Sequence, residues 1–211
     1  MEHLRCDEYS FQYNSELNAK FEYNKNFLSK NEIDKLTCYL DSLTLFNVYD
    51  STQNIVRKQL WIKNENDVFC KEWKKQYERW TPHKFSPILF ELMTRIESYT
   101  NSKFNSCLIN YYRDGNDFVR MHQDTSASFG LFPTIANISL GSTRDIIFES
   151  IIPNKTKSLG KENKNGPRFS QNLENGSLFI MRDAANHIFK HGINKCASSK
   201  SRYSLTFRNH N

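Results

Sequence analysis

Long apolar runs are missing from this sequence of 211 residues. A helix that crosses a bilayer needs about 20 consecutive apolar residues, and no stretch here approaches that length. The N-terminal run Met-Glu-His-Leu-Arg also lacks the apolar core of a secretory signal peptide. We therefore expect a protein with no membrane partner and no targeting segment.

Paired cysteines are missing as well. The cysteines are odd in number, widely scattered and without a Cys-x-x-Cys pair: Cys6, Cys38, Cys70, Cys107 and Cys196. This pattern argues against a disulfide framework and against a zinc knuckle. We expect an intracellular protein with reduced thiols, and the sequence does not distinguish the nucleus from the cytoplasm.

Acidic residues are outnumbered by basic ones, and the formal net charge is +6. A basic surface suits a polyanionic partner such as a nucleic acid, although a modest excess of lysine is also common on ordinary soluble proteins. The content of 38% hydrophobic and 14% aromatic residues is enough to bury one substantial core. Disorder is therefore excluded as the main state of the chain.

Two helices are predicted in the first half of the chain. One begins with the capping-box sequence Ser29-Lys-Asn-Glu32. The other begins with Ser86 as N-cap and Pro87 in the first turn. Apolar residues follow both starts at helical spacing: Ile33, Leu36, Leu40 and Leu43, then Leu89, Leu92, Met93, Ile96 and Tyr99. These stripes indicate packing on a core rather than a cofactor site.

Short β-rich runs separated by turn signals dominate the second half of the chain. They cover residues 107–112, 134–140, 146–149, 177–181, 188–192 and 203–207. Such a series favours a sandwich or jelly roll over alternating βαβ units. We expect one domain over residues 21–211, with helices in 21–103 and the strand-rich core in 104–211. Residues 1–20 have no clear period and are predicted to form a flexible or loosely docked extension.

The most informative motif is His122-Gln-Asp124. Two side chains at alternate positions of a strand point to the same face, so this pair can bind one metal ion together with a distant histidine. Two histidines and one carboxylate leave three positions open on an octahedral iron, enough for a bidentate co-substrate and dioxygen. His187 and His191 both remain candidates for the third ligand, because residues four apart share a face of an extended strand.

Several further motifs accompany this one between residues 20 and 208. They are Asn110-x-Tyr112, Asp114-Gly115, Ile138-Ser-Leu-Gly141, Arg144-Asp145-x-x-Phe148, Phe189-Lys-His191-Gly192 and Arg202-x-Ser-x-Thr-Phe-Arg208. Together they resemble the AlkB-type oxidative dealkylases of nucleic acids, which depend on Fe(II) and 2-oxoglutarate. Arg57-Lys58-Gln59 and Leu108-Ile109-Asn110 look closest to the eukaryotic DNA-repair branch. The resemblance implies a mainly β, α+β fold: a double-stranded β-helix (jelly roll) with N-terminal helices and a nucleotide-recognition lid.

The resemblance also implies the metal and co-substrate ligands. Its Phe-Lys-His-Gly context selects His191, so that His122, Asp124 and His191 would bind the iron. The residues implied to bind 2-oxoglutarate are Asn110, Tyr112, Arg202, Ser204, Thr206 and Arg208. Arginine suits bidentate recognition of carboxylates; Arg202 would bind the distal carboxylate and Arg208 would lie nearer the metal. Ser204 departs from the family, which usually has Asn at this position.

Substrate recognition is predicted in the lid, residues 45–80, and in one basic loop, residues 153–168. A base methylated on its pairing face must leave the stack before it can be oxidised, which requires aromatic and cationic surfaces. The substrate-binding candidates are Arg57, Gln59, Trp61, Tyr77, Trp80, Arg144 and Asp145. The candidates for the nucleic-acid backbone are Lys155, Lys157, Lys161, Lys164 and Arg168. A small apolar cluster and a solvated loop are the alternatives for these two regions.

One further departure affects the choice of substrate. Repair-type members usually carry a second carboxylate after the metal-binding Asp, which accepts a hydrogen bond from the exocyclic amine of the flipped base. Here Thr125-Ser126-Ala127 follow Asp124. The sequence therefore leaves the lesion open.

We expect a monomeric dioxygenase that uses Fe(II), 2-oxoglutarate and O2 to demethylate bases of the 1-methyladenine and 3-methylcytosine type in DNA or RNA. The products would be formaldehyde, succinate and CO2. Two alternatives remain: an oxygenase that acts on a protein or another non-nucleic substrate, and a non-catalytic nucleic-acid-binding module. The sequence does not distinguish DNA from RNA or single from double strands.

Overall fold

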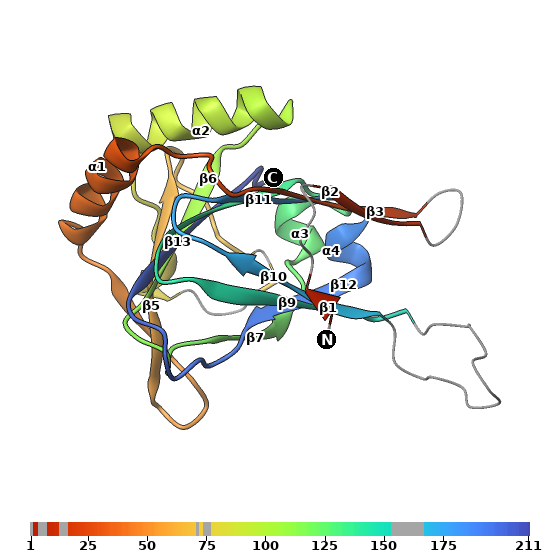
Figure 1. Cartoon of the computed structure of the whole chain (residues 1–211). Coiled ribbons are helices and arrows are strands. Elements are labelled where there is room, and N and C mark those ends of the chain that lie inside the picture. Colours follow the sequence, from red (N-terminus) through yellow and green to blue (C-terminus); the bar gives the residue numbers. More distant parts are fainter. Residues whose placement is uncertain (1, 4–7, 13–16, 71, 74–76, 153–166) are drawn as a thin grey trace.

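Figure 1 shows the computed structural model, which describes residues 2–3, 8–12, 17–70, 72–73, 77–152 and 167–211. Strands dominate it, and helices α1 and α2 lie together along one side. The strands are β1 (Glu2–His3), β2 (Glu8–Gln12), β3 (Asn18–Asn24), β4 (Phe46–Tyr49), β5 (Ile55–Lys63), β6 (Ser106–Tyr112), β7 (Val119–His122), β8 (Ile135–Gly141), β9 (Arg144–Ser150), β10 (Arg168–Leu173), β11 (Leu178–Asp183), β12 (Phe189–Ile193) and β13 (Arg202–Arg208). The helices are α1 (Lys30–Asp41), the 3-10 helix η1 (Glu78–Trp80), α2 (Pro87–Thr100), α3 (Ser126–Phe129) and α4 (Ala185–Ile188).

The strands form two sheets. The larger has the order β2-β3-β11-β8-β13-β6-β5-β4, and all its neighbours are antiparallel. The smaller has the order β1-β10-β9-β12-β7, in which only the short pair β1–β10 is parallel. Two largely antiparallel sheets that share a core match the predicted mainly β jelly roll.

Helices α1 and α2 cover the outer face of the larger sheet. The predicted capping box is present: the Ser29 hydroxyl accepts from the Glu32 N–H, and the Glu32 carboxylate accepts from the Ser29 N–H at 2.8 Å. Ser86 caps α2 as predicted, with Pro87 at its first position. Tyr99 differs from the expectation, because its side chain is 51% exposed at the rim of the helix. Within the described residues, no helix is long and apolar enough to cross a membrane.

The six predicted strands are present as β6, β8, β9, β11, β12 and β13. The N-terminal region differs from the prediction. Its described residues form β1, β2 and the start of β3. β1 pairs with β10, β2 pairs with β3, and β3 pairs with β11. Ala19 and Phe21 alternate with polar residues along β3 and are buried, and this short period-2 pattern is too brief to stand out in the sequence.

The core between the two sheets is built around phenylalanine rings. Phe21 on β3 is 1% exposed, and its ring centroid lies 4.9 Å from that of Phe148, 5.1 Å from that of Phe169 and 5.5 Å from that of Phe189. These partners belong to β9, β10 and β12 of the smaller sheet. Phe21 therefore connects the two layers.

Strand β13 carries the alternation predicted from the sequence. Tyr203, Leu205 and Phe207 belong to the apolar cluster beneath α1 and α2. The intervening residues, Arg202, Ser204, Thr206 and Arg208, line a pocket. Since side chains alternate across a strand, the face opposite the helices is left for polar chemistry.

We predict that Phe21→Ala lowers the free energy of unfolding by about 3–5 kcal/mol, because a buried aromatic side chain would be replaced by a cavity. Phe90→Ala is the matched control, since Phe90 is 52% exposed on α2, and it should change stability by less than about 0.5 kcal/mol. Urea unfolding of both variants measures the difference. Equal losses would contradict the connecting role of Phe21.

Candidate active site

The two histidines of the predicted metal site lie opposite each other on paired strands. His122 ends β7, and its register partner on β12 is His191. Their ring centroids are 4.4 Å apart. Directly opposed residues of an antiparallel pair point to the same face, so backbone pairing alone brings together two side chains far apart in the sequence.

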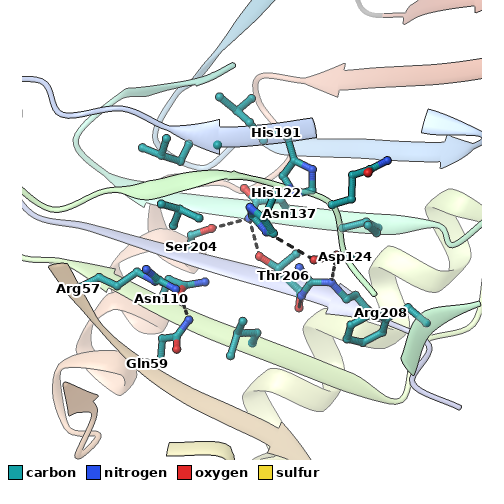
Figure 2. Close-up of a pocket in the computed structure, with 18 of the residues that line it drawn as sticks. Arg57, Gln59, Asn110, His122, Asp124, Asn137, His191, Ser204, Thr206 and Arg208 are labelled. Atoms are coloured by element: carbon teal, nitrogen blue, oxygen red, sulfur yellow. Dashed lines mark hydrogen bonds and ion pairs between the residues drawn. The ribbon is translucent and has the colours of Figure 1, made fainter. Parts of the chain in front are cut away.

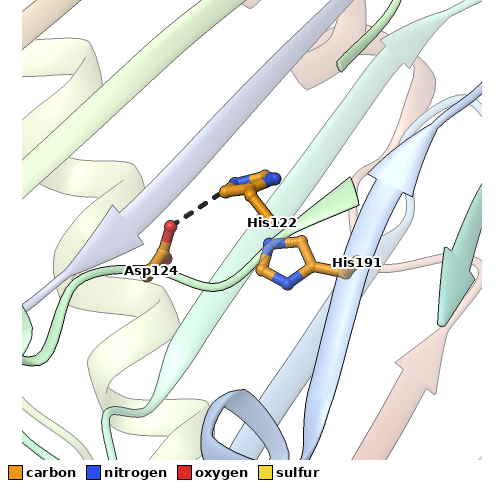
Figure 3. A group of neighbouring side chains, drawn as sticks. All are labelled: His122, Asp124 and His191. Carbon is orange, nitrogen blue, oxygen red and sulfur yellow. Dashed lines mark ion pairs between the residues drawn. The ribbon is translucent and has the colours of Figure 1, made fainter. Parts of the chain in front are cut away.

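Asp124 follows β7 and completes the group. The potential ligand atoms of His122, Asp124 and His191 all lie within 4.8 Å of one another (Figure 3). His187, the alternative third ligand, is exposed on α4, and its ring packs against Phe132 at 5.7 Å. The structure therefore selects His191, in agreement with the resemblance.

Gly192 permits the close approach of β7 and β12. A Cβ atom at this position would lie 2.8 Å from the Val119 carbonyl oxygen, closer than real contacts allow. The register of the two strands also shifts between His191 and Ile193. A larger residue at 192 would push β7 away, and His122 would move with it.

The protonation states suit metal binding. The Nδ1 atom of His122 lies 2.9 Å from the Arg120 carbonyl oxygen; an N–H there leaves Nε2, 3.6 Å from the Asp124 carboxylate, with a free lone pair. Burial, together with the nearby His122, lowers the pKa of His191 to about 3. His191 is therefore neutral at physiological pH and can act as a ligand.

Arg208 keeps Asp124 ionised. Burial by itself raises the pKa of Asp124, but the Arg208 guanidinium, together with His122 and His191, outweighs it and holds this pKa well below its usual range. The Arg208 Nε atom lies 2.5 Å from an Asp124 oxygen. The site thus offers two imidazoles and one carboxylate, the donor set typical of non-haem Fe(II) oxygenases.

Asn186 holds the backbone of Asp124, a role that sequence reasoning missed. Its amide oxygen accepts from the Asp124 N–H at 2.9 Å, and its amide nitrogen donates to the Asp124 carbonyl at 3.0 Å. The Gln123 side chain donates to the Asn186 carbonyl at 2.8 Å. The loop that carries the metal-binding carboxylate is therefore fastened to α4. No sequence motif marks Asn186.

Arg202 is a buried cation with unsatisfied donors. Its side chain is 1% exposed, and its Nε and Nη1 atoms have no hydrogen-bond partner. Nη2 donates to the Ser139 hydroxyl at 2.8 Å, and the guanidinium lies 5.1 Å from the centre of the Tyr112 ring. Burial lowers the pKa of Arg202. Unsatisfied buried donors are costly, and a ligand carboxylate would remove this cost.

An amide from a neighbouring strand supports Ser204. Asn137 on β8 donates to the Ser204 hydroxyl at 2.6 Å and to the Thr206 hydroxyl at 3.1 Å (Figure 2). The Ser139 hydroxyl donates to the Asn137 amide oxygen at 3.2 Å. Where the family usually has Asn at position 204, this chain has Ser204 with the Asn137 side-chain amide beside it. Asn137 is a second residue that the sequence analysis missed.

Arg57 and Gln59 meet Asn110 across β5 and β6. The Asn110 amide oxygen lies 3.0 Å from the Arg57 Nε atom and 2.8 Å from the Gln59 amide nitrogen. All three line the pocket. Arg57 and Gln59 were predicted to bind substrate, and Asn110 was predicted to bind 2-oxoglutarate. The three side chains form one hydrogen-bonded group on the pocket wall (Figure 2).

The pocket above the metal group measures about 460 Å³ and has an aromatic wall. Trp80, predicted to bind substrate, stacks on Phe69 with ring centroids 4.0 Å apart. Trp73, one of the aromatic residues of the predicted lid, also lines the pocket. So do Phe69, Glu72 and Arg79, to which the sequence analysis assigned no site role. Their side chains come from the stretch predicted as a lid.

Four predicted substrate residues do not line the pocket. Trp61 is fully buried in an apolar cluster with Phe69 and Trp80. Arg144 is buried and donates to the backbone carbonyls of Asp114, Asp117 and Asn194. Asp145 accepts from Asn172 on the adjacent strand, and Tyr77 lies exposed beside the Arg79 guanidinium. These side chains are structural or peripheral, because the fold directs them away from the cavity.

Of the residues predicted to contact the nucleic-acid backbone, Arg168 lies within the described residues. Arg168 is the exposed first residue of β10. Lys155, Lys157, Lys161 and Lys164 lie outside the described residues.

The comparisons with known proteins agree with this geometry. Residues 20–208 match the family model of the 2OG-Fe(II) oxygenase superfamily. The chain is 38% identical over 131 residues to the alpha-ketoglutarate-dependent dioxygenase alkB homolog 3 of Mus musculus, which covers 60% of this chain and 43% of that protein. It is 31% identical over 150 residues to the DNA oxidative demethylase ALKBH2 of Arabidopsis thaliana, which covers 63% of this chain and 48% of that protein. The chain thus spans less than half the length of these relatives.

A solved structure supports the fold. The structure of OsALKBH1 superimposes with a TM-score of 0.60 over 94% of this chain and 99% of that one, at 14% sequence identity. A likeness at this identity establishes the architecture alone.

We predict that Asn186→Ala weakens Fe(II) binding by about 10- to 100-fold, because the Asp124 loop would lose both of its backbone contacts to Asn186. His187→Ala is the matched control, since that side chain is exposed beside Asn186, and it should bind iron like the unmodified protein. Competition with a metal chelator measures both affinities. Indistinguishable affinities in the two variants would contradict the role of Asn186.

Proposed function

Because this chain belongs to the 2OG-Fe(II) oxygenase superfamily, we propose that it removes N-linked methyl groups from bases of nucleic acids with Fe(II), 2-oxoglutarate and O2. One observation carries the proposal: the metal-binding group, the unsatisfied Arg202 and an aromatic wall all border the same pocket. The relatives named as alkB homolog 3 and DNA oxidative demethylase support the same substrate class.

The residues present fit an iron ion. His122, Asp124 and His191 would hold it, because their donor atoms are mutually close, and because the pKa values of Asp124 and His191 favour a carboxylate and a neutral imidazole. Three protein ligands leave the remaining octahedral positions for co-substrates. When bound, the iron supplies the activation of dioxygen, which no side chain here can perform.

Arg202 would bind the distal carboxylate of 2-oxoglutarate. Its Nε and Nη1 atoms are buried donors without partners, and guanidinium pairs with carboxylate in a bidentate manner. The Tyr112 ring beneath the guanidinium restricts its orientation. Arg208 is already engaged by Asp124, so the two arginines have separate tasks.

The aromatic wall would receive the flipped base. Trp73 and Trp80 line the pocket together with Phe69, and stacking on such side chains accepts any base. Further apolar residues of the pocket lining would exclude water from the reacting methyl group: Ile135, Ile146, Leu173, Phe179 and Met181. The net charge of +6 favours a polyanionic substrate, DNA or RNA.

The net reaction balances with the proposed co-substrates. One atom of O2 enters succinate as 2-oxoglutarate loses CO2, and the other enters a C–H bond of the methyl group. The resulting N–CH2OH group breaks at its C–N bond as its hydroxyl proton is released to solvent, so that formaldehyde leaves and the nitrogen keeps the electron pair of the broken bond. The protein contributes orientation, charge stabilisation and exclusion of water.

An intracellular location is supported by the free thiols of the described cysteines, Cys38, Cys70, Cys107 and Cys196, because thiols persist in reducing compartments. The monomeric state stays a prediction, which light scattering would test.

The decisive experiment uses single- and double-stranded DNA and RNA oligonucleotides that carry one 1-methyladenine or 3-methylcytosine. We expect loss of the methyl mass together with succinate, only in the presence of 2-oxoglutarate. His122→Ala should lose both products, and His187→Ala should retain them. Succinate without methyl loss would redirect the search to another substrate. If folded, iron-loaded protein formed neither product, a non-catalytic binding module would be the remaining interpretation.

We predict that Arg202→Lys weakens 2-oxoglutarate binding at least about tenfold, because an ammonium group cannot replace the bidentate guanidinium. Arg120→Lys is the matched control, since Arg120 is exposed and does not line the pocket, and it should leave the affinity unchanged. Calorimetry with Mn(II) in place of Fe(II) avoids turnover. Equal affinities for the two variants would contradict the role of Arg202.

A further inference from the structure

Among the described residues that line the pocket, two are carboxylates, Asp124 and Glu72. Asp124 belongs to the metal group and is paired with Arg208. Glu72 is exposed, and no described cation forms an ion pair with it. One carboxylate of the pocket is therefore available to a ligand.

Thr125 holds Glu72 in place. The Thr125 hydroxyl donates to a Glu72 carboxylate oxygen at 2.9 Å. Thr125 occupies the N-cap position of α3, yet its side chain makes no capping hydrogen bond. The hydroxyl is thus used to orient Glu72 instead of the helix. Because Thr125 directly follows Asp124, this bond fixes the carboxylate relative to the metal group.

The chain segment that precedes Glu72 is also anchored. The Phe69 carbonyl accepts from the Ser128 hydroxyl at 2.8 Å, and the His210 ring nitrogen Nε2 lies 2.9 Å from the same oxygen. Both partners are buried. The Phe69 backbone, three residues before Glu72, is therefore held by two buried side chains.

An exposed aromatic ring lies next to Glu72. Trp73 is 39% exposed, and its ring centroid is 5.4 Å from that of Trp80. A carboxylate next to an exposed indole ring is suited to a flat cation, which can stack on the ring and pair with the charge.

The remaining charges of the pocket make such a carboxylate necessary. The pocket is lined by Arg57, Arg79, Arg202 and Arg208. Arg208 is paired with Asp124, and Arg202 would be paired with the co-substrate carboxylate, which leaves the charges of Arg57 and Arg79. A cationic ligand would be repelled by this excess of positive charge. Glu72 is the described lining residue that can offset the repulsion.

We propose that Glu72 selects cationic methylated bases by accepting a hydrogen bond from their exocyclic amino group, with Thr125 as the residue that positions it. The proposal rests on the proposed function and assigns its specificity. Methylation at N3 of cytosine produces a cation with an amino group at position 4. Methylation at N3 of thymine leaves a neutral base with a carbonyl at that position, which would face the carboxylate with a like partial charge.

The test is a competition between 3-methylcytosine and 3-methylthymine in otherwise identical single strands, with the kcat/KM ratio as readout. Because a ratio is independent of the fraction of active enzyme, partial unfolding of a variant does not affect it. The unmodified protein should prefer 3-methylcytosine. Glu72→Gln keeps an oxygen for the Thr125 hydroxyl but removes the charge, and it should lower the ratio by about tenfold or more.

Two further variants separate charge from structure. Glu78→Gln removes the same charge from the exposed residue of η1, outside the pocket, and should leave the ratio unchanged. Thr125→Val removes only the positioning hydroxyl and should lower the ratio by less than Glu72→Gln does. The proposal would be overturned if the kcat/KM ratio of Glu72→Gln stayed within twofold of that of the unmodified protein. It would also be overturned if Glu72→Gln and Glu78→Gln lowered this ratio equally. Demethylation of neither base by the unmodified protein would instead overturn the proposed function itself.

Discussion

The antiparallel pairing of β7 with β12 is the constraint on which the active site depends. It places His122 directly opposite His191, and Asp124 follows within two residues. A slip of one residue would turn one of the histidines to the other face of the sheet. The absence of a side chain at Gly192 allows the strands to approach, so the metal geometry is set by backbone contacts before any ion binds.

The second constraint is the cost of burying two arginines on β13. For Arg208, the ion pair with Asp124 offsets the cost of burying the charge. The cost is not offset for Arg202, because two of its donors lack partners. A buried cation without an anion is unfavourable, and the fold tolerates it where a ligand carboxylate completes the site. The apolar layer formed by Tyr203, Leu205 and Phe207 against the helices stabilises the strand that carries both charges.

The sequence predicted a residue's place where that place depends on local spacing. It did not predict the place where this depends on whether the side chain points into the pocket or away from it. Trp61 and Arg144 have the residue types of a nucleotide site, yet both are buried away from the pocket. Trp61 points into an apolar cluster, and Arg144 binds backbone carbonyls. Conversely, Asn137 and Asn186 support the site without any motif, because each acts through a partner at least 60 residues away in the chain.

The sequence by itself determined the helix caps, the strand-rich core, the His-x-Asp pair and the alternation along β13, because each depends on periodicities within a few residues. Spacing alone left His187 and His191 open, the family resemblance indicated His191, and the tertiary structure places it in the metal group. Tertiary structure alone decided that Arg202 is left unsatisfied and that Glu72 meets Thr125. Those outcomes depend on strand register and on contacts between distant segments, and local pattern carries no information about either.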